Sequence, residues 1–179
     1  MPNSFIATVR EIESQDIQLI ADYWLNCDPE FLMSMGVDLE KVPSRNELTQ
    51  MLTYQLNCNY HEKTSYAMIW ELNGKAVGHC NVNNIRFGEE AKIHLHIWHQ
   101  ENRQKGIGSE LFCMSLPYFF NHLKLQKLVC EPFAHNNAPN KTLKKLGFTL
   151  SKTYTTIPGS INFEQKVNRW ELHQESFIS

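Results

Sequence analysis

The stretch that decides the fold is Ile-His-Leu-His-Ile-Trp at residues 93–98, followed closely by Arg-Gln-Lys-Gly-Ile-Gly at residues 103–108. In the first run apolar residues alternate with histidine, which is typical of a strand with two different faces. The second run opens a long amphipathic stretch, and its glycines let the backbone approach an anion without a Cβ in the way. The free N–H groups at the start of a helix favour that anion. The order strand, glycine turn, helix therefore indicates a phosphate-binding turn.

Two common nucleotide motifs do not fit this turn. The dinucleotide fingerprint needs a third glycine, where the chain has Leu111, and the P-loop needs Gly-Lys-Ser/Thr, where the chain has Gly-Ser-Glu at residues 108–110. A solvated turn with incidental glycines is the simpler alternative, so a second motif has to decide.

That second motif is Asn-Asn-Ala-Pro-Asn-Lys-Thr-Leu-Lys-Lys-Leu-Gly-Phe at residues 136–148. The glycine turn resembles the Gln/Arg-x-x-Gly-x-Gly/Ala signature of the GCN5-related N-acetyltransferases (GNAT), and the second motif resembles that family's Asn-led helix ending in Leu-Gly-Phe. The spacing leaves room for one helix and one strand, as the family requires. The resemblance covers roughly the whole chain and is strongest from residue 93 to residue 148.

Composition favours one globular domain over residues 1–179, because 179 residues with 42% hydrophobic content can bury a substantial core. The formal charge of −2, from 17 basic and 19 acidic residues, argues against a nucleic-acid binder. No apolar stretch is long enough to span a membrane, and the first residues lack the pattern of a signal peptide. The five cysteines are scattered, odd in number and without C-x-x-C spacing. They indicate reduced thiols and hence a cytoplasmic protein.

The pattern along the chain predicts an α+β fold. Helices are expected from about Ser14 to Asn26, from the capping box at Ser44, after the glycine turn with a kink or division at Pro117, and from Pro139 to Gly147. A loop is expected at residues 28–43, which contain two prolines and a glycine. Strands are expected at residues 5–12, 64–72, 75–85, 91–98, 125–131, 148–156 and 167–173, with a tight turn at residues 73–74. The resemblance implies a single GNAT-type domain, with a mixed central sheet of about seven strands flanked by about four helices and splayed between strands four and five.

The resemblance also implies transfer of an acetyl group from acetyl-CoA to a primary amine by direct attack in a ternary complex. An amine with a pKa of about 10.4 is almost wholly protonated at pH 7, so a base is useful. His94 and His96 share one strand face and are the first catalytic candidates, because neutral histidine titrates near the working pH. Glu131 is the carboxylate alternative, since Lys92 stands where many members of the family have a glutamate. For the histidines, packing or hydrogen bonding inside the strand is the structural alternative.

Three groups of residues are expected to hold coenzyme A if the resemblance is right. A backbone N–H near the end of the fourth strand polarises the thioester carbonyl, the glycine turn binds the pyrophosphate, and the Asn-led helix meets the pantetheine arm. Leu143 aligns with a tyrosine that many members use to protonate the leaving thiolate, which leaves the general acid open. The residues in these groups are Ile97, Trp98, Arg103, Gln104, Lys105, Gly106, Ile107, Gly108, Ser109, Asn136, Asn140, Lys141 and Leu143.

A second hypothesis is a catalytically impaired acyl-CoA-binding sensor or interaction module of the same fold, which Lys92 and Leu143 favour. No metal is expected, because no third ligand accompanies the two strand histidines at a suitable spacing. The expected partners are acetyl-CoA and an amine acceptor, without nucleic acid or membrane, and a homodimer is left open. The acceptor itself is not indicated by the near-neutral charge. Residues 28–43 and the turn at residues 158–159 are expected to form the walls of its site.

Overall fold

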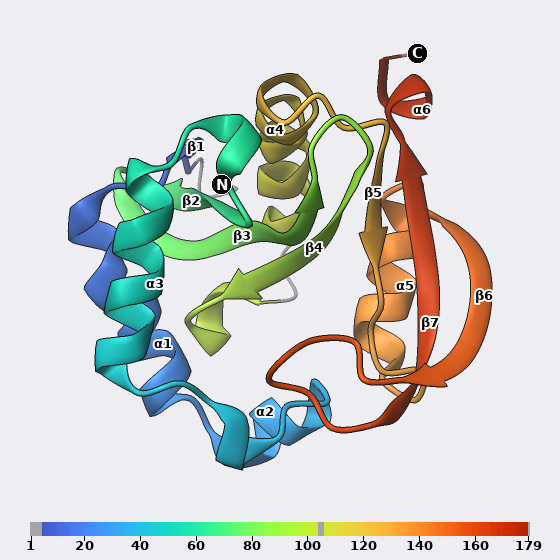
Figure 1. The fold of residues 1–179 in the computed structure, drawn as a ribbon, viewed down its shortest axis with the longest axis horizontal. Coiled ribbons are helices and arrows are strands. Elements are labelled where there is room, and N and C mark those ends of the chain that lie inside the picture. Colours follow the sequence, from blue (N-terminus) through green and yellow to red (C-terminus); the bar gives the residue numbers. More distant parts are fainter. Residues whose placement is uncertain (1–4, 104–105, 179) are drawn as a thin grey trace.

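The computed structural model describes residues 5–103 and 106–178 (Figure 1). One sheet contains seven strands in the order β1-β2-β3-β4-β5-β7-β6. Within it β4 and β5 are parallel and the other neighbours are antiparallel, which confirms the expected mixed sheet. The strands are β1 (Ala7–Glu11), β2 (Ser65–Leu72), β3 (Lys75–Arg86), β4 (Glu90–Ile97), β5 (Lys127–Cys130), β6 (Thr149–Thr156) and β7 (Gln165–His173).

Helices cover both faces of this sheet. In Figure 1, α1 and α3 lie next to each other on one side of β2, β3 and β4, α4 lies on the other side, and α5 lies behind β5 and β7. Among the described residues, none of the helices is both long enough and apolar enough to cross a bilayer. The helices are α1 (Ile17–Asn26), α2 (Pro29–Ser34), α3 (Arg45–Asn57), α4 (Ile107–His122), α5 (Asn137–Lys145) and α6 (Gln174–Ile178).

Local turn and capping signals in the sequence are confirmed. Asn73 and Gly74 both have positive φ, 51° and 75°, as the tight turn between β2 and β3 requires. At the start of α3, Ser44 Oγ accepts the Glu47 N–H at 3.3 Å, and the Glu47 carboxylate accepts the Ser44 N–H at 2.8 Å. Gly147, with φ of 88°, follows the end of α5 in the left-handed conformation that favours glycine.

One expectation about proline is wrong, and of the two outcomes expected at Pro117, division of its helix does not occur. Residues 28–43 are not simply a loop, because α2 occupies Pro29–Ser34. Asp28 accepts the Glu30 N–H at 2.8 Å, and Pro29 at the first helical position is already set at a helical φ. Pro117 does not divide α4, which continues to His122. The apolar side chains on both sides of Pro117 are buried against the sheet, so tertiary packing offsets the lost helical hydrogen bond.

The core lies between the sheet and α4. Trp70 of β2 is fully buried there, and its Nε1–H donates to Ser115 Oγ at 2.9 Å. Ser115 in turn donates to the Leu111 carbonyl at 2.8 Å, so the polar groups within this apolar layer are paired. Three aromatic side chains of α4 fill the same layer: Phe112, Phe119 and Phe120.

The sheet opens between β4 and β5, as expected. The two strands pair through three residue pairs, Glu90–Lys127, Ala91–Leu128 and Lys92–Val129. From there β5 continues against β7, while β4 continues to Ile97 against β3. Figure 1 shows β4 leaning away from β5, with the β6–β7 loop passing between this region and α2. The opening lies beside the start of α4, so the glycine turn and the end of β4 meet there.

We expect Leu111→Ala to lower the free energy of unfolding by about 2–5 kcal/mol, because Leu111 is fully buried beneath the sheet and the truncation leaves a cavity. Met114→Ala, on the same helix but 37% exposed, serves as the matched control and should cost less than about 0.5 kcal/mol. Urea unfolding followed by circular dichroism measures both values. Equal losses in the two variants would contradict this picture of the core.

Candidate functional site

The histidines of β4 lie on the sheet face that α1 covers. His96 is buried, and its Nδ1 lies 3.1 Å from the Tyr23 hydroxyl of α1. Its ring stacks on His79 of β3, with 4.6 Å between centroids, and the Trp24 ring contacts it edge-on. Burial, reinforced by His79, lowers the pKa of His96 well below its ordinary value, while burial raises that of Tyr23. His96 is therefore a neutral side chain in an aromatic environment, which favours the structural alternative for this residue.

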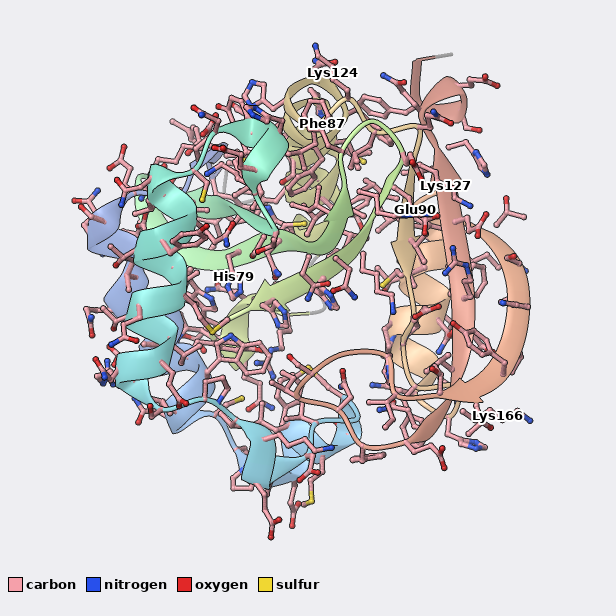
Figure 2. The ribbon with its side chains drawn as sticks, viewed as in Figure 1. His79, Phe87, Glu90, Lys124, Lys127 and Lys166 are labelled. Atoms are coloured by element: carbon pink, nitrogen blue, oxygen red, sulfur yellow. The ribbon has the colours of Figure 1, made fainter. Side chains whose placement is uncertain are left out.

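His79 is a site residue that the sequence analysis missed. It lies directly opposite His96 in the β3–β4 ladder and is labelled in Figure 2. Trp98 donates its Nε1–H to His79 Nδ1 at 2.7 Å, so the side chain of Trp98 is engaged within the protein. Burial, assisted by His94, lowers the pKa of His79 to about 3. The signal was present only in part: the short turn at residues 87–89 pairs β3 with β4, but a register shift between Asn83 and Arg86 sets which residue lies opposite His79.

His94 differs from these two residues because it is only half-buried. Its Nε2 lies 3.2 Å from Asn83 Oδ1, and its ring is 6.5 Å from that of His96. Burial and the nearby Lys92 charge lower the pKa of His94 to about 4, although Glu131 opposes them. The imidazole is consequently uncharged at neutral pH and can accept a proton.

Glu131 lies just after β5, on the other side of the opening. Its side chain is 2% exposed, accepts hydrogen bonds from Tyr154 and, at 3.2 Å, from Arg169, and lies 2.7 Å from Lys92 Nζ. Burial alone would raise the pKa of Glu131, but Lys92, Tyr154 and Arg169 together hold it below its ordinary value. An ionised carboxylate with three protein partners is a poor base. Its catalytic role stays a prediction that this geometry does not favour.

Lys92 joins three elements at the point where β4 and β5 part. Besides its ion pair with Glu131, its ammonium donates to the Pro158 carbonyl at 2.9 Å. Lys92 thus links β4, the end of β5 and the β6–β7 loop. This contact explains what a lysine does at a position where the family resemblance led us to expect a glutamate.

The glycine turn has the geometry of an anion-binding helix start. Gly106 has φ of 76° and precedes α4, and among the described residues no side chain caps the first turn. A Cβ on Gly108 would lie 3.1 Å from Ile97 Cδ1, so a larger residue would press against β4. Ser109 uses its own N–H within the turn, donating to the Gly106 carbonyl at 3.1 Å. Over the residues that the structure describes, the N–H groups of Ile107 and Gly108 have no hydrogen-bond acceptor, and at the start of a helix such groups can bind an anion.

Arg103 holds the start of this turn against its neighbours. Its Nε and Nη2 donate to the Ile97 carbonyl at 3.2 and 3.0 Å, and its guanidinium lies 4.0 Å from the centre of the Phe31 ring. This places Arg103 between β4 and α2 instead of free in solvent. Gln104 and Lys105, also expected to bind phosphate, lie outside the described residues.

Of the two backbone groups expected to polarise a thioester, the geometry favours Ile97. The Trp98 N–H donates to the Val77 carbonyl at 2.9 Å and is therefore part of the β3–β4 ladder. Successive N–H groups of a strand point to opposite edges. The Ile97 N–H consequently points to the edge that β5 leaves open.

The Asn-led helix uses its polar side chains largely to hold itself in place. Asn140 donates to the carbonyls of Phe133 and Asn136 at 3.2 and 2.7 Å. Its Oδ1 accepts hydrogen bonds from Asn168 and Trp170 of β7 at 2.9 and 2.8 Å. These four bonds give Asn140 a structural role, and its expected contact with coenzyme A stays a prediction.

The other three residues expected on this helix lie in different environments. Asn136 donates to the Ser34 carbonyl of α2 at 3.2 Å, whereas Lys141 is exposed. Leu143 is 2% exposed and packs in the main core. Leu143 therefore supplies packing where the resemblance suggested a proton donor.

The two segments expected to form the acceptor walls are joined to each other. Val37 and Asn162 form an isolated antiparallel bridge, and the Asp38 N–H donates to the Ile161 carbonyl at 2.8 Å. The Gly36 carbonyl accepts hydrogen bonds from the side chains of Asn162 and Gln165, at 2.8 and 2.9 Å. Their role in binding an acceptor stays a prediction. Over the described residues, no group of three or more His, Cys, Asp or Glu side chains is placed to hold a metal ion.

Comparison with known proteins gives a family and a fold. The model of the acetyltransferase (GNAT) domain matches residues 7–149. Spermidine N-acetyltransferase from Vibrio cholerae, in complex with CoA and spermine, has a TM-score of 0.77 and 20% identity, over 97% of this chain and 98% of that chain. A dodecameric structure of the same enzyme has a TM-score of 0.72 and 19% identity, over 97% and 96%. A ribosomal alpha-N-protein acetyltransferase in complex with coenzyme A has a TM-score of 0.75 and 15% identity, over 96% of both chains. No curated protein matches the chain significantly.

We expect Lys92→Met to lower the free energy of unfolding at pH 7 by about 2 kcal/mol, because it removes one of the three partners of the buried Glu131 carboxylate. The two partners that remain keep the loss below that of a fully unpaired buried charge. The lowered pKa of Glu131 stabilises the protein above the unfolded-state pKa of about 4.3, and this contribution is lost as the pH falls through the folded-state pKa. The deficit should therefore shrink at about pH 3.5.

Urea unfolding at the two pH values tests this expectation. Lys166→Met removes an exposed lysine from β7 and should change stability by less than about 0.5 kcal/mol. A Lys92 deficit that is the same at both pH values would mean that Glu131 does not depend on Lys92.

Proposed function

The chain belongs to the acetyltransferase (GNAT) family and is an acyltransferase, and from this premise we propose the reaction and its residues. We propose that it transfers an acetyl group from acetyl-CoA to a primary amine by direct attack in a ternary complex. The observation that carries the proposal is the opening between β4 and β5. It lies beside an uncapped α4 start and leaves the Ile97 N–H without a strand partner on that edge.

The fit to coenzyme A rests on the chain's own backbone. Two positions of the turn are glycine, one with positive φ and one where a Cβ would lie 3.1 Å from Ile97 Cδ1, so the loop is shaped for close approach by a large anion. In this proposal the N–H groups of Ile107 and Gly108 bind the pyrophosphate. Arg103 keeps the turn against β4.

The Ile97 N–H supplies the electrostatic part of catalysis. When an amine attacks the thioester carbonyl, negative charge develops on the oxygen. A fixed backbone donor stabilises that charge without reorganising, which is commonly worth about 3–4 kcal/mol. Because a backbone group does this, the side chain at residue 97 is free to pack against the glycine turn.

His94 accepts the proton that the amine loses during attack. It is half-buried at the edge of the opening and uncharged at neutral pH, since its pKa lies at about 4. The other two candidates are less suitable as the base. His96 is enclosed by aromatic rings, and Glu131 is ion-paired. Leu143 gives no proton to the leaving group, but a thiol with a pKa of about 8.5 leaves readily as thiolate.

The acceptor that the charges support best is a monoamine, of a small molecule or a protein. Three carboxylates on the sheet near the opening already have basic partners: Glu131 pairs with Lys92, Glu90 with Arg86 and Lys127, and Glu171 with Arg169. A polyamine is recognised through carboxylates that are not neutralised. A homodimer and a cytoplasmic location belong to the same proposal. One similar structure is a dodecamer, and the cysteines of this chain are free.

A second candidate is an acyl-CoA-binding module that no longer catalyses. Leu143 in the core and Lys92 in an ion pair favour it, because each stands where a catalytic side chain was expected. It predicts acetyl-CoA binding without thiol release.

We expect Gly108→Glu to weaken coenzyme A binding at least tenfold, about 1.4 kcal/mol, because it adds bulk and negative charge to the turn. Calorimetry with coenzyme A and a thermal unfolding control measures this. Gly108→Gln is matched in size and should bind more tightly than Gly108→Glu. A folded Gly108→Glu protein with wild-type affinity would show that the pyrophosphate binds elsewhere.

We expect thiol release from acetyl-CoA with an amine panel of spermidine, free amino acids and a tripeptide with a free N-terminus, and faster release with a monoamine than with spermidine.

His94→Ala should lower kcat by about 10²–10⁴ with nearly unchanged affinity for coenzyme A, and His99→Ala on the exposed loop should behave as wild type. If only His96→Ala shows the loss, the base is one strand repeat away, and if neither does, Glu131 is next. Binding without release for every amine would establish the second candidate.

A further inference from the structure

One side chain of the neighbouring strand lies within hydrogen-bond distance of the His94 ring. Asn83 of β3 faces Lys92 in the ladder and is thus a diagonal neighbour of His94. Its Oδ1 lies 3.2 Å from His94 Nε2. An amide oxygen accepts hydrogen bonds and has no proton to give. The ring nitrogen that faces it therefore carries the hydrogen.

A neutral imidazole has one N–H, so Nδ1 of His94 is left with a lone pair. In the part of the chain that the structure describes, no residue forms a hydrogen bond with this Nδ1. The neighbouring histidines differ, since the Nδ1 atoms of His79 and His96 already have Trp98 and Tyr23 as partners. His94 is also the half-buried member of the row, whereas the other two are 3% and 8% exposed.

We propose that Asn83 is a positioning residue that holds His94 as the neutral tautomer with its hydrogen on Nε2, so that Nδ1 is the proton acceptor of the reaction. The inference rests on the proposed function in one respect, the role of His94 as base. The orientation itself is a property of the free protein. An amide suits this task because it fixes the tautomer without adding charge, unlike the carboxylate that orients histidine in a catalytic triad.

The charges around His94 make the difference between an amide and a carboxylate at residue 83 measurable as a change in the pKa of His94. Burial and the charge of Lys92 on its own strand oppose protonation of the ring. His96 on β4, whose ring lies 6.5 Å away, and His79 on β3, which stacks on His96, are themselves uncharged because burial lowers their pKa values. Glu131 after β5 favours protonation, but it is held by Arg169 of β7 and Tyr154 of β6. A carboxylate in place of the Asn83 amide would add an opposite charge at hydrogen-bond distance, which raises a pKa by about 1–3 units.

Two substitutions separate orientation from charge. Asn83→Asp keeps an oxygen acceptor and adds the charge, and Asn83→Leu removes the acceptor. Asn84→Asp is the matched control, because it adds the same charge at the adjacent exposed position, whose φ of 48° aspartate tolerates. Nitrogen-15 NMR of the imidazoles, with His94 assigned from His94→Ala, reports the tautomer and the titration without any substrate.

We expect the Nε2–H tautomer in the wild type and a mixture of tautomers in Asn83→Leu. In Asn83→Asp the His94 titration should move up by 1–3 pH units from about 4, and in Asn84→Asp it should stay in place. Kinetics use acetyl-CoA with the fastest amine of the panel above. At pH 8, Asn83→Leu should lose about tenfold or more in kcat with an unchanged KM for acetyl-CoA, and Asn83→Asp should keep most of the activity.

At each pH, kcat/KM of Asn83→Asp is divided by that of the wild type. Ionisation of the amine affects both proteins equally and therefore drops out of this ratio. Protonation of His94 in the variant should lower this ratio between pH 8 and pH 5, by about twofold if the titration moves up by one pH unit and by about tenfold if it moves up by two. A wild-type tautomer in Asn83→Leu, or a His94 titration in Asn83→Asp at the wild-type pH, would overturn the inference. If the tautomer and titration respond as expected but His94→Ala keeps full turnover, the orientation holds and the proposed base is wrong.

Discussion

The rest of the structure depends on how briefly β4 and β5 are paired. Three residue pairs join them, and beyond Lys92 the outer edge of β4 has no strand beside it. An unpaired strand edge presents a row of backbone donors and acceptors, which is normally a liability. Here the edge faces the start of α4, and its last residue, Ile97, already gives its carbonyl to Arg103. What remains is an N–H pointing into the opening.

The opening is held by side chains from parts of the chain that are far apart in sequence. Lys92, Glu131 and the Pro158 carbonyl link β4, β5 and the β6–β7 loop on one side. Arg103 links β4 to the Phe31 ring of α2 on the other. Charged side chains can link these elements because the sheet already fixes the positions of their partners. Little conformational entropy is then lost when the side chains pair. The same pairing makes Glu131 a poor base, which is why we propose a histidine for proton transfer.

Local signals carried the sequence analysis furthest. The helix start after the glycine turn, the turn at Asn73 and Gly74 and the capping box at Ser44 each depend on residues within a few positions of one another, and each is confirmed. Phosphate binding by the glycine turn stays a prediction. The mixed sheet and its opening followed from the family resemblance. The missed features depend on long-range contacts: α2 is stabilised by burial of Leu32, and Asn140 is occupied by partners on β7. His79 was only partly within reach, because β3 and β4 are joined by a short turn but a register shift between Asn83 and Arg86 places it opposite His96.

The stacked histidines have a consequence for how the protein tolerates acid. His79 and His96 are buried with lowered pKa values, so the folded protein leaves them uncharged at pH values where the unfolded chain, with a histidine pKa of about 6.5, already binds protons. Their contribution to stability is complete above about pH 6.5 and falls as the pH drops below it, by about 1.4 kcal/mol per pH unit for each ring. Two such rings remove about 2.7 kcal/mol over one pH unit, a sizeable share of the 5–15 kcal/mol typical of a folded domain. The buried pair of His79 and His96 thus sets a lower pH limit for the folded state.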